Sequence, residues 1–117
     1  MTASVAALDD LTFSNTVEIN AAGFGLVAFW SPRCVLCLLV GAVMDQVISD
    51  FATRVQFARV DVDRSPITGQ RWGVRSLPHL TLFWNGAVVG ELVGMVRRSD
   101  LTTFLDAHMR KSQSVPG

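Results

Sequence analysis

The sequence predicts an α/β domain with a mixed central sheet of four to five strands and helices on both faces. Two observations support this prediction. Apolar runs typical of buried strands alternate with segments of helical periodicity, and the turn Asn85-Gly86 joins the last two strand-like runs as a hairpin. The 117 residues, half of them apolar, are enough for one domain with its own core. We expect a single domain over residues 1–117, with flexible ends at about 1–6 and 112–117.

The predicted elements follow the order (β)αβαβαββα, in which the first strand is optional. In chain order they are a weak helix over Leu11–Asn20, a strand over Gly23–Trp30, a helix over Cys34–Phe51, a strand over Val55–Val62, a short helix capped by Ser65 that stops at Gly73, strands over Leu80–Trp84 and Ala87–Val93, and a last helix capped by Ser99. The Cys34–Phe51 helix supplies the crossover that parallel strands require. The hairpin is expected at one edge of the sheet.

Composition narrows the class of protein. Ten basic and ten acidic residues give no net charge, so no long-range field favours nucleic acid or a membrane surface. Met1–Leu8 does not resemble a secretory signal, and the longest apolar stretch, Cys34–Met44, is too short to span a bilayer. Two cysteines are too few for a secreted disulfide framework. We therefore expect a cytoplasmic protein that binds neither nucleic acid nor membrane.

The two cysteines form a C-x-x-C motif, Cys34-Val35-Leu36-Cys37, just past a buried strand and at the start of a helix. Free backbone N–H groups and the helix dipole favour a thiolate at Cys34. Residues three apart share one helix face, so the two sulfurs can meet in a disulfide. Cys34 is expected to be the exposed nucleophile and Cys37 the buried resolving cysteine.

Five motifs together resemble the thioredoxin family. They are Phe29–Cys37 (FWSPRCVLC), Val60–Asp63 (VDVD), Gly73–Pro78 (GVRSLP), Leu82–Gly86 (LFWNG) and Val93-Gly94. The resemblance runs from about Phe13 to Met109 with consistent spacing. It implies the thioredoxin fold and a protein-disulfide oxidoreductase without a cofactor. We expect a monomer that acts on disulfide-containing proteins and is recycled by a reductase such as a thioredoxin reductase.

The resemblance also implies roles for individual residues. Pro78 is expected to follow a cis peptide bond and to bind substrate together with Trp30, Leu77 and Gly94. Arg59 stands where the family usually has a lysine near the buried sulfur.

Several positions depart from the family pattern. The buried aspartate that serves the resolving cysteine in the family is Ala28 here, which leaves Cys37 without an evident base. His79 follows Pro78 and is a candidate substitute base, although the sequence favours an ordinary surface or strand histidine. Arg33 and Arg75 are candidates for a cationic rim that modulates Cys34, or are simply solvated.

Two other functions stay open at this point. The first is a thioredoxin-like binding or chaperone module whose redox pair is slow or vestigial, which Ala28 favours. The second is a metal or cluster carrier with His79 as a third ligand, although structural sites normally need four ligands. We predict no metal site within the chain.

Overall fold

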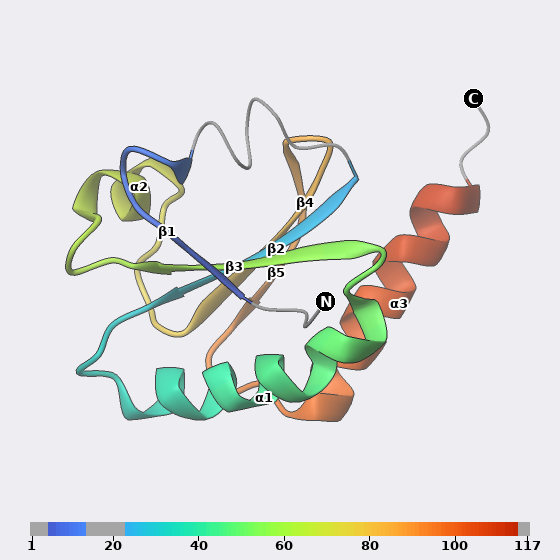
Figure 1. Ribbon diagram of the computed structural model, residues 1–117, viewed down its shortest axis with the longest axis horizontal. Helices are drawn as coiled ribbons and strands as arrows, with labels where there is room; N and C mark the ends of the chain where they lie inside the picture. Colours follow the sequence, from blue (N-terminus) through green and yellow to red (C-terminus); the bar gives the residue numbers. More distant parts are fainter. Residues whose placement is uncertain (1–4, 14–22, 115–117) are drawn as a thin grey trace.

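The structure is a computed structural model that describes residues 5–13 and 23–114, with side chains described up to Lys111. Its centre is a mixed sheet of five strands in the order β1-β3-β2-β4-β5 (Figure 1). The strands are β1 (Ala6–Leu8), β2 (Phe24–Trp30), β3 (Val55–Asp61), β4 (His79–Trp84) and β5 (Ala87–Val93). The helices are α1 (Val35–Phe51), α2 (Pro66–Arg71) and α3 (Arg98–Ser114). This is the predicted fold class. The predicted helix over Leu11–Asn20 lies mostly outside the described residues.

Strand direction explains the connections. Both β1 and β2 pair with β3 in parallel, whereas β4 is antiparallel to β2, and β5 is antiparallel to β4. The chain leaves β2, returns through α1 and enters β3 beside it, as the predicted crossover requires. The β4–β5 hairpin forms one edge of the sheet, as predicted.

Two apolar clusters cover the two faces of the sheet. Alternate residues of β2 belong to different clusters: Leu26 and Ala28 pack with α1 and α3, whereas Val27 and Phe29 pack on the opposite face. Figure 1 shows α1 and α3 together on one side of the sheet and α2 on the other. The three central strands β2, β3 and β4 therefore hold side chains in both cores, which fixes the position of the end of β2 from both sides.

The hairpin turn has the geometry that its sequence favours. Asn85 and Gly86 have φ angles of +50° and +84°, the left-handed conformation that a two-residue turn needs at both positions. The amide N–H of Gly23 donates to Oδ1 of Asn85 at 2.7 Å, and the amide N–H of Asn85 donates to the Gly23 carbonyl at 2.9 Å. The turn is thereby attached to the residue that precedes β2.

Some predicted boundaries were wrong. Helix α3 begins at Arg98, so Ser99 lies inside the helix and does not cap it; the Asp100 carboxylate accepts from the Arg97 amide N–H at 3.0 Å. Ser65 does precede α2, but its side chain makes no capping hydrogen bond. Strand β1 begins at Ala6 and α3 continues to Ser114, so both elements reach into the terminal segments for which the sequence analysis expects flexibility.

Helix α1 continues without interruption from Val35 to Phe51. No helix in the described part of the chain is long and apolar enough to cross a membrane.

Candidate active site

A short connection places the cysteine pair directly at the end of β2. The carbonyl of Ser31 accepts from the amide N–H of Cys34 at 3.0 Å. The buried hydroxyl of Ser31 donates to the Asp63 carboxylate at 2.6 Å and accepts from the Arg33 amide N–H at 3.2 Å. These bonds join the connection to the segment that follows β3, so the start of α1 is fixed relative to the sheet.

Cys34 is the N-cap residue of α1. Its Sγ accepts a hydrogen bond from the backbone N–H of Cys37 at 3.1 Å, in the position where a capping side chain normally serves a helix. The first turn of α1 contains no acidic residue. Negative charge on the Cys34 sulfur therefore faces free amide N–H groups and the positive end of the helix dipole.

Cys34 and Cys37 form a disulfide, and their Cα atoms are 5.2 Å apart. Cys37 is only 4% exposed, whereas Cys34 is half-buried. The exposed neighbours of the pair, Val35 and Leu36, are apolar. A disulfide partner that approaches from solvent thus meets Cys34 before Cys37.

Pro78 immediately precedes β4, and Gly94 immediately follows β5. The Leu77–Pro78 peptide bond is cis, as the resemblance implied. The Pro78 carbonyl accepts from the Gly94 amide N–H at 2.9 Å, and Gly94 has a φ of +90° that favours glycine. Leu77 is half-buried against the cluster on the α2 side of the sheet. Pro78 lines the same pocket as Cys37.

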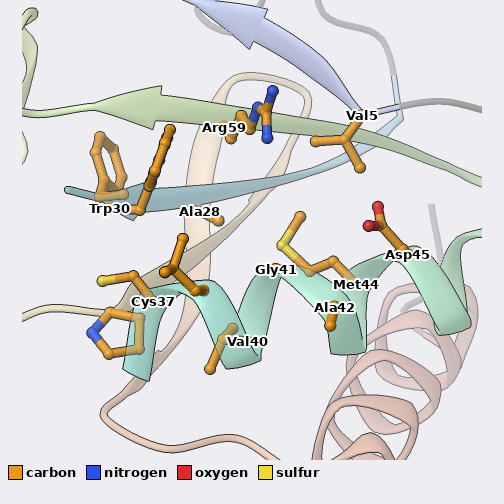
Figure 2. A pocket seen from close by; sticks show the side chains of 13 residues that line it. Val5, Ala28, Trp30, Cys37, Val40, Gly41, Ala42, Met44, Asp45 and Arg59 are labelled. Carbon is orange, nitrogen blue, oxygen red and sulfur yellow. The ribbon is translucent and has the colours of Figure 1, made fainter. Parts of the chain in front are cut away.

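This pocket, with a volume of about 270 Å³, lies between α1 and the sheet (Figure 2). Ala28, 6% exposed, forms part of its wall, so no carboxylate reaches Cys37 from this position. Trp30 and Arg59 also line it, and the Arg59 guanidinium lies 5.5 Å from the centre of the Trp30 ring. Asp45, which the sequence analysis did not single out, lines the pocket from α1.

Arg33 is paired with an acid. Its guanidinium lies 3.2 Å from Oδ1 of Asp63. The hydrogen bond from Ser31, followed by that from Arg33, lowers the pKa of Asp63 below its ordinary value. The positive charge predicted beside Cys34 is therefore offset by a nearby carboxylate. Arg75 is exposed in the segment between α2 and β4.

His79 faces away from Cys37. It is buried, and its ring meets that of Phe29 edge-on with the centroids 6.0 Å apart. Side chains alternate between the two faces of the sheet, and the paired residues Ala28 and Leu80 belong to the cluster that faces α1. Phe29 and its pairing partner His79 therefore face the opposite side, where Phe29 belongs to the second cluster. Nε2 of His79 lies 3.7 Å from Oε2 of Glu91 and has no hydrogen-bond partner among the described residues. This placement does not favour His79 as a base for Cys37.

The metal-carrier interpretation finds no support in the side chains that the structure describes. They include no group of three or more histidine, cysteine, aspartate or glutamate residues placed to hold a metal ion. His79 and Cys37 lie on opposite faces of the sheet, so the proposed third ligand does not converge with the cysteine pair.

A mixed five-stranded sheet, a cysteine pair that closes a disulfide at the start of a helix, and a cis-proline beside that pair define a thiol–disulfide oxidoreductase. A family model described as Thioredoxin matches residues 4–107. The chain belongs to the thioredoxin family.

Individual relatives agree with this assignment. The chain is 34% identical over 104 residues to thioredoxin 1 of Synechococcus elongatus, which covers 89% of this chain and 96% of that protein. It is 33% identical over 102 residues to thioredoxin of Haemophilus influenzae, covering 87% and 94%. It is also 33% identical over 87 residues to the chloroplastic M-type thioredoxin of Zea mays, covering 74% and 52%. The family acts on disulfide substrates and is recycled by reductases.

Proposed function

We propose that the chain is a single-domain, monomeric thioredoxin that reduces disulfides of proteins in the cytoplasm, with Cys34 as nucleophile and Cys37 as resolving cysteine. The observation that supports these roles is the difference between the two sulfurs. Cys34 is half-buried at the N-cap of α1, whereas Cys37 is buried one turn inside the helix.

The reaction then proceeds in two exchange steps. The Cys34 thiolate attacks one sulfur of the substrate disulfide, which forms a mixed disulfide and releases the other substrate sulfur as a thiolate. Cys37 loses its proton and attacks Cys34 Sγ, so the Cys34–Cys37 bond forms and the mixed disulfide breaks. The substrate gains two electrons and, with two protons from solvent, leaves as a dithiol. A reductase such as a thioredoxin reductase returns two electrons to the cysteine pair.

We propose that the substrate backbone binds across Trp30, Leu77, Pro78 and Gly94. The hydrogen bond from the Gly94 amide N–H to the Pro78 carbonyl supports this proposal, because it joins the segment before β4 to the segment after β5, and Pro78 lines the same pocket as Cys37. The exposed apolar side chains of Val35 and Leu36, 71% and 44% accessible, favour substrates whose disulfide is flanked by apolar residues.

Four further residues are proposed to modulate the site without reacting. Arg33 and Arg75 contribute positive charge near the entrance, and the ion pair with Asp63 weakens the contribution of Arg33. Arg59 fixes Trp30 through the contact with its ring. His79 supports Phe29 behind β2.

Serine substitutions test the assignment of the two cysteines. We expect Cys37→Ser to accumulate a mixed disulfide with a disulfide-containing protein such as insulin, because attack by Cys34 still occurs and resolution does not. Cys34→Ser should form no such adduct under the same conditions. Mass spectrometry after acid quenching measures the adduct. Accumulation on Cys34→Ser instead would reverse the two roles.

Ala28 favours a second function, a thioredoxin-like binding module with a slow redox pair, since the pocket beside Cys37 has no carboxylate at that position. Insulin reduction with a dithiol donor separates the two functions. Turnover well above the uncatalysed rate supports the oxidoreductase, whereas insulin reduction at the background rate supports the module.

A further inference from the structure

The pocket behind the disulfide connects Cys37 with a carboxylate two helical turns away. Cys37, Gly41 and Asp45 are spaced four residues apart on α1 and therefore lie along one helix face. All three line the pocket of about 270 Å³. Figure 2 shows Cys37 near one end, the Asp45 carboxylate near the other end directed toward the sheet, and Gly41 between them.

Gly41 leaves the space between the two ends open. A Cβ atom at this position would have no heavy atom within 4 Å, apart from the neighbouring helix backbone. On the sheet side, Ala28 contributes only a methyl group to the wall. The pocket thus forms a groove that has the Cys37 side chain near one end and the Asp45 carboxylate near the other, with the Met44 side chain also projecting into it (Figure 2).

The groove is large enough for water, and its mostly apolar lining includes two charged side chains. A cavity needs roughly 10–15 Å³ and two to four polar partners to hold one water molecule, so about 270 Å³ admits several. Among the described residues that line it, Asp45 and Arg59 are charged. Both can bind water, Asp45 at the end away from Cys37 and Arg59 on the sheet side between the two ends (Figure 2).

We propose that Asp45 accepts the proton of the Cys37 thiol through water in this groove when Cys37 resolves the mixed disulfide. The inference rests on the resolving role proposed for Cys37. In this step the proton passes by way of water to the Asp45 carboxylate and then to solvent. The Cys37 thiolate forms the bond to Cys34 Sγ, and the substrate sulfur leaves with the electron pair of the broken bond.

The other titratable groups around Cys37 are unsuited to this role. Arg59, from β3, has no site that accepts a proton at neutral pH. Asp63 is held by Ser31 and Arg33. Asp61, at the end of β3, accepts from the backbone of Asp63. His79, from β4, faces the opposite side of the sheet.

Single-turnover kinetics of Asp45→Asn test the proposal directly. Reduced protein is mixed with an equimolar aromatic disulfide whose released thiolate absorbs visible light. The first thiolate reports attack by Cys34, and the second reports resolution by Cys37. We expect Asp45→Asn to leave the first phase unchanged and to slow the second by about tenfold at neutral pH, a modest general-base effect because the proton moves through water.

Whether Asp45→Asn slows or speeds the second phase distinguishes a role in proton transfer from a purely electrostatic effect of the Asp45 charge on the Cys37 thiolate. Removing a negative charge near Cys37 stabilises its thiolate, which would speed the second phase if charge alone mattered. Asp50→Asn is the matched control, because it removes the same charge from an exposed position of the same helix. It should leave both phases unchanged.

Blocking the groove provides a second variant. Gly41→Leu places an apolar side chain between Cys37 and Asp45 and should slow the second phase while Asp45 is retained. Ser49→Leu, at an exposed position of α1, is its control. Sodium acetate, compared with sodium chloride at equal ionic strength, should restore part of the rate to Asp45→Asn, whereas Gly41→Leu should gain less.

The outcomes separate this inference from the proposed function. A second phase at the wild-type rate or faster in Asp45→Asn overturns the role of Asp45, and the oxidoreductase assignment then still stands. Absence of the first phase in the wild-type protein would instead overturn the proposed role of Cys34. Far-ultraviolet circular dichroism shows that each variant is folded.

Discussion

At the scale of single residues, Asp63 holds the connection that leads to Cys34. Its carboxylate accepts from the Ser31 hydroxyl at 2.6 Å and pairs with the exposed guanidinium of Arg33. Asp63 follows β3, whereas the other two residues follow β2, so these contacts join the ends of neighbouring strands. Both contacts favour the ionised form of the Asp63 carboxyl, so their contribution to the free energy of unfolding depends on pH.

The sign of this dependence follows from the lowered pKa of Asp63. A carboxyl whose pKa is lower in the folded protein than in the unfolded chain stabilises the fold above about pH 4, and the contribution is lost as the pH falls through the folded-state pKa. We expect Asp63→Asn to melt at a lower temperature than the wild type at pH 7. The difference should shrink toward about pH 3. Thermal unfolding at several pH values measures it.

The two partners of Asp63 provide the control. The hydrogen bond from Ser31 is the larger cause of the lowered pKa, and the one from Arg33 is second. Ser31→Ala should therefore reproduce more of the Asp63→Asn effect than Arg33→Gln does. An equal loss at pH 3 and pH 7 in Asp63→Asn would contradict this explanation.

Residue-level prediction from sequence worked where the determinants are local. The spacing of Cys34 and Cys37 and their place at a helix start are visible in a few consecutive residues. The surroundings of His79 depend instead on strand register: Phe29 pairs with His79 and Ala28 with Leu80, which decides the face on which each side chain lies. The role of Asp63 depends on a partner 30 residues away, and the sequence gives no local signal for that pair.

At the scale of elements, the start of α3 is set by Asp100. Its carboxylate, three residues after Arg97, accepts from the Arg97 amide N–H and pairs with the Arg97 guanidinium at 3.2 Å. This is the backward half of a capping box, in which the third helical residue satisfies the amide group of the N-cap. An acid in the first turn also suits the positive end of the helix dipole.

We therefore expect Asp100→Ala to lower the melting temperature by a few degrees, the typical cost of losing a helix cap in a small domain. Ser99→Ala should have no measurable effect, because Ser99 is exposed and lies inside the helix. Thermal unfolding of both variants at neutral pH compares them. A larger loss for Ser99→Ala would restore Ser99 as the cap that the sequence analysis predicted.

The elements themselves could be predicted better than their ends. The apolar run of β2, the helical spacing of α1 and the Asn85-Gly86 turn each fix an element within a short window, and all three were confirmed. Ser99 and Asp100 are both residue types that cap helices, so sequence alone could not choose between them. Strand β1 has three residues, too few for a periodic signal, and it forms by pairing with β3.

At the scale of the whole molecule, one sheet supports two cores. The cluster facing α1 and α3 includes Leu26, and the cluster on the opposite face includes Phe83. Neighbouring strands β2 and β4 contribute residues to both clusters. Disruption of either cluster therefore destabilises β2 and β4, and these two strands also supply side chains to the other cluster.

This arrangement predicts one cooperative unfolding transition. We expect Leu26→Ala to cost about 2–5 kcal/mol and Phe83→Ala about 3–5 kcal/mol, because both side chains are fully buried. In each variant, tryptophan fluorescence and far-ultraviolet circular dichroism should follow the same urea curve. Two separated transitions in either variant would show that the two faces of the sheet unfold independently.

The position of Trp30 at the pocket that Cys37 lines has a practical consequence. The chain contains three tryptophans and no tyrosine, so its ultraviolet emission comes from three indoles. Trp72 packs against Phe13 and Phe83 on the far face of the sheet, and Trp84 stacks on Phe24 at the hairpin end of β4. Reduction or oxidation of the Cys34–Cys37 disulfide is therefore expected to change the surroundings of Trp30 alone among the three tryptophans. The intrinsic tryptophan fluorescence should then report the oxidation state of the cysteine pair without an attached dye.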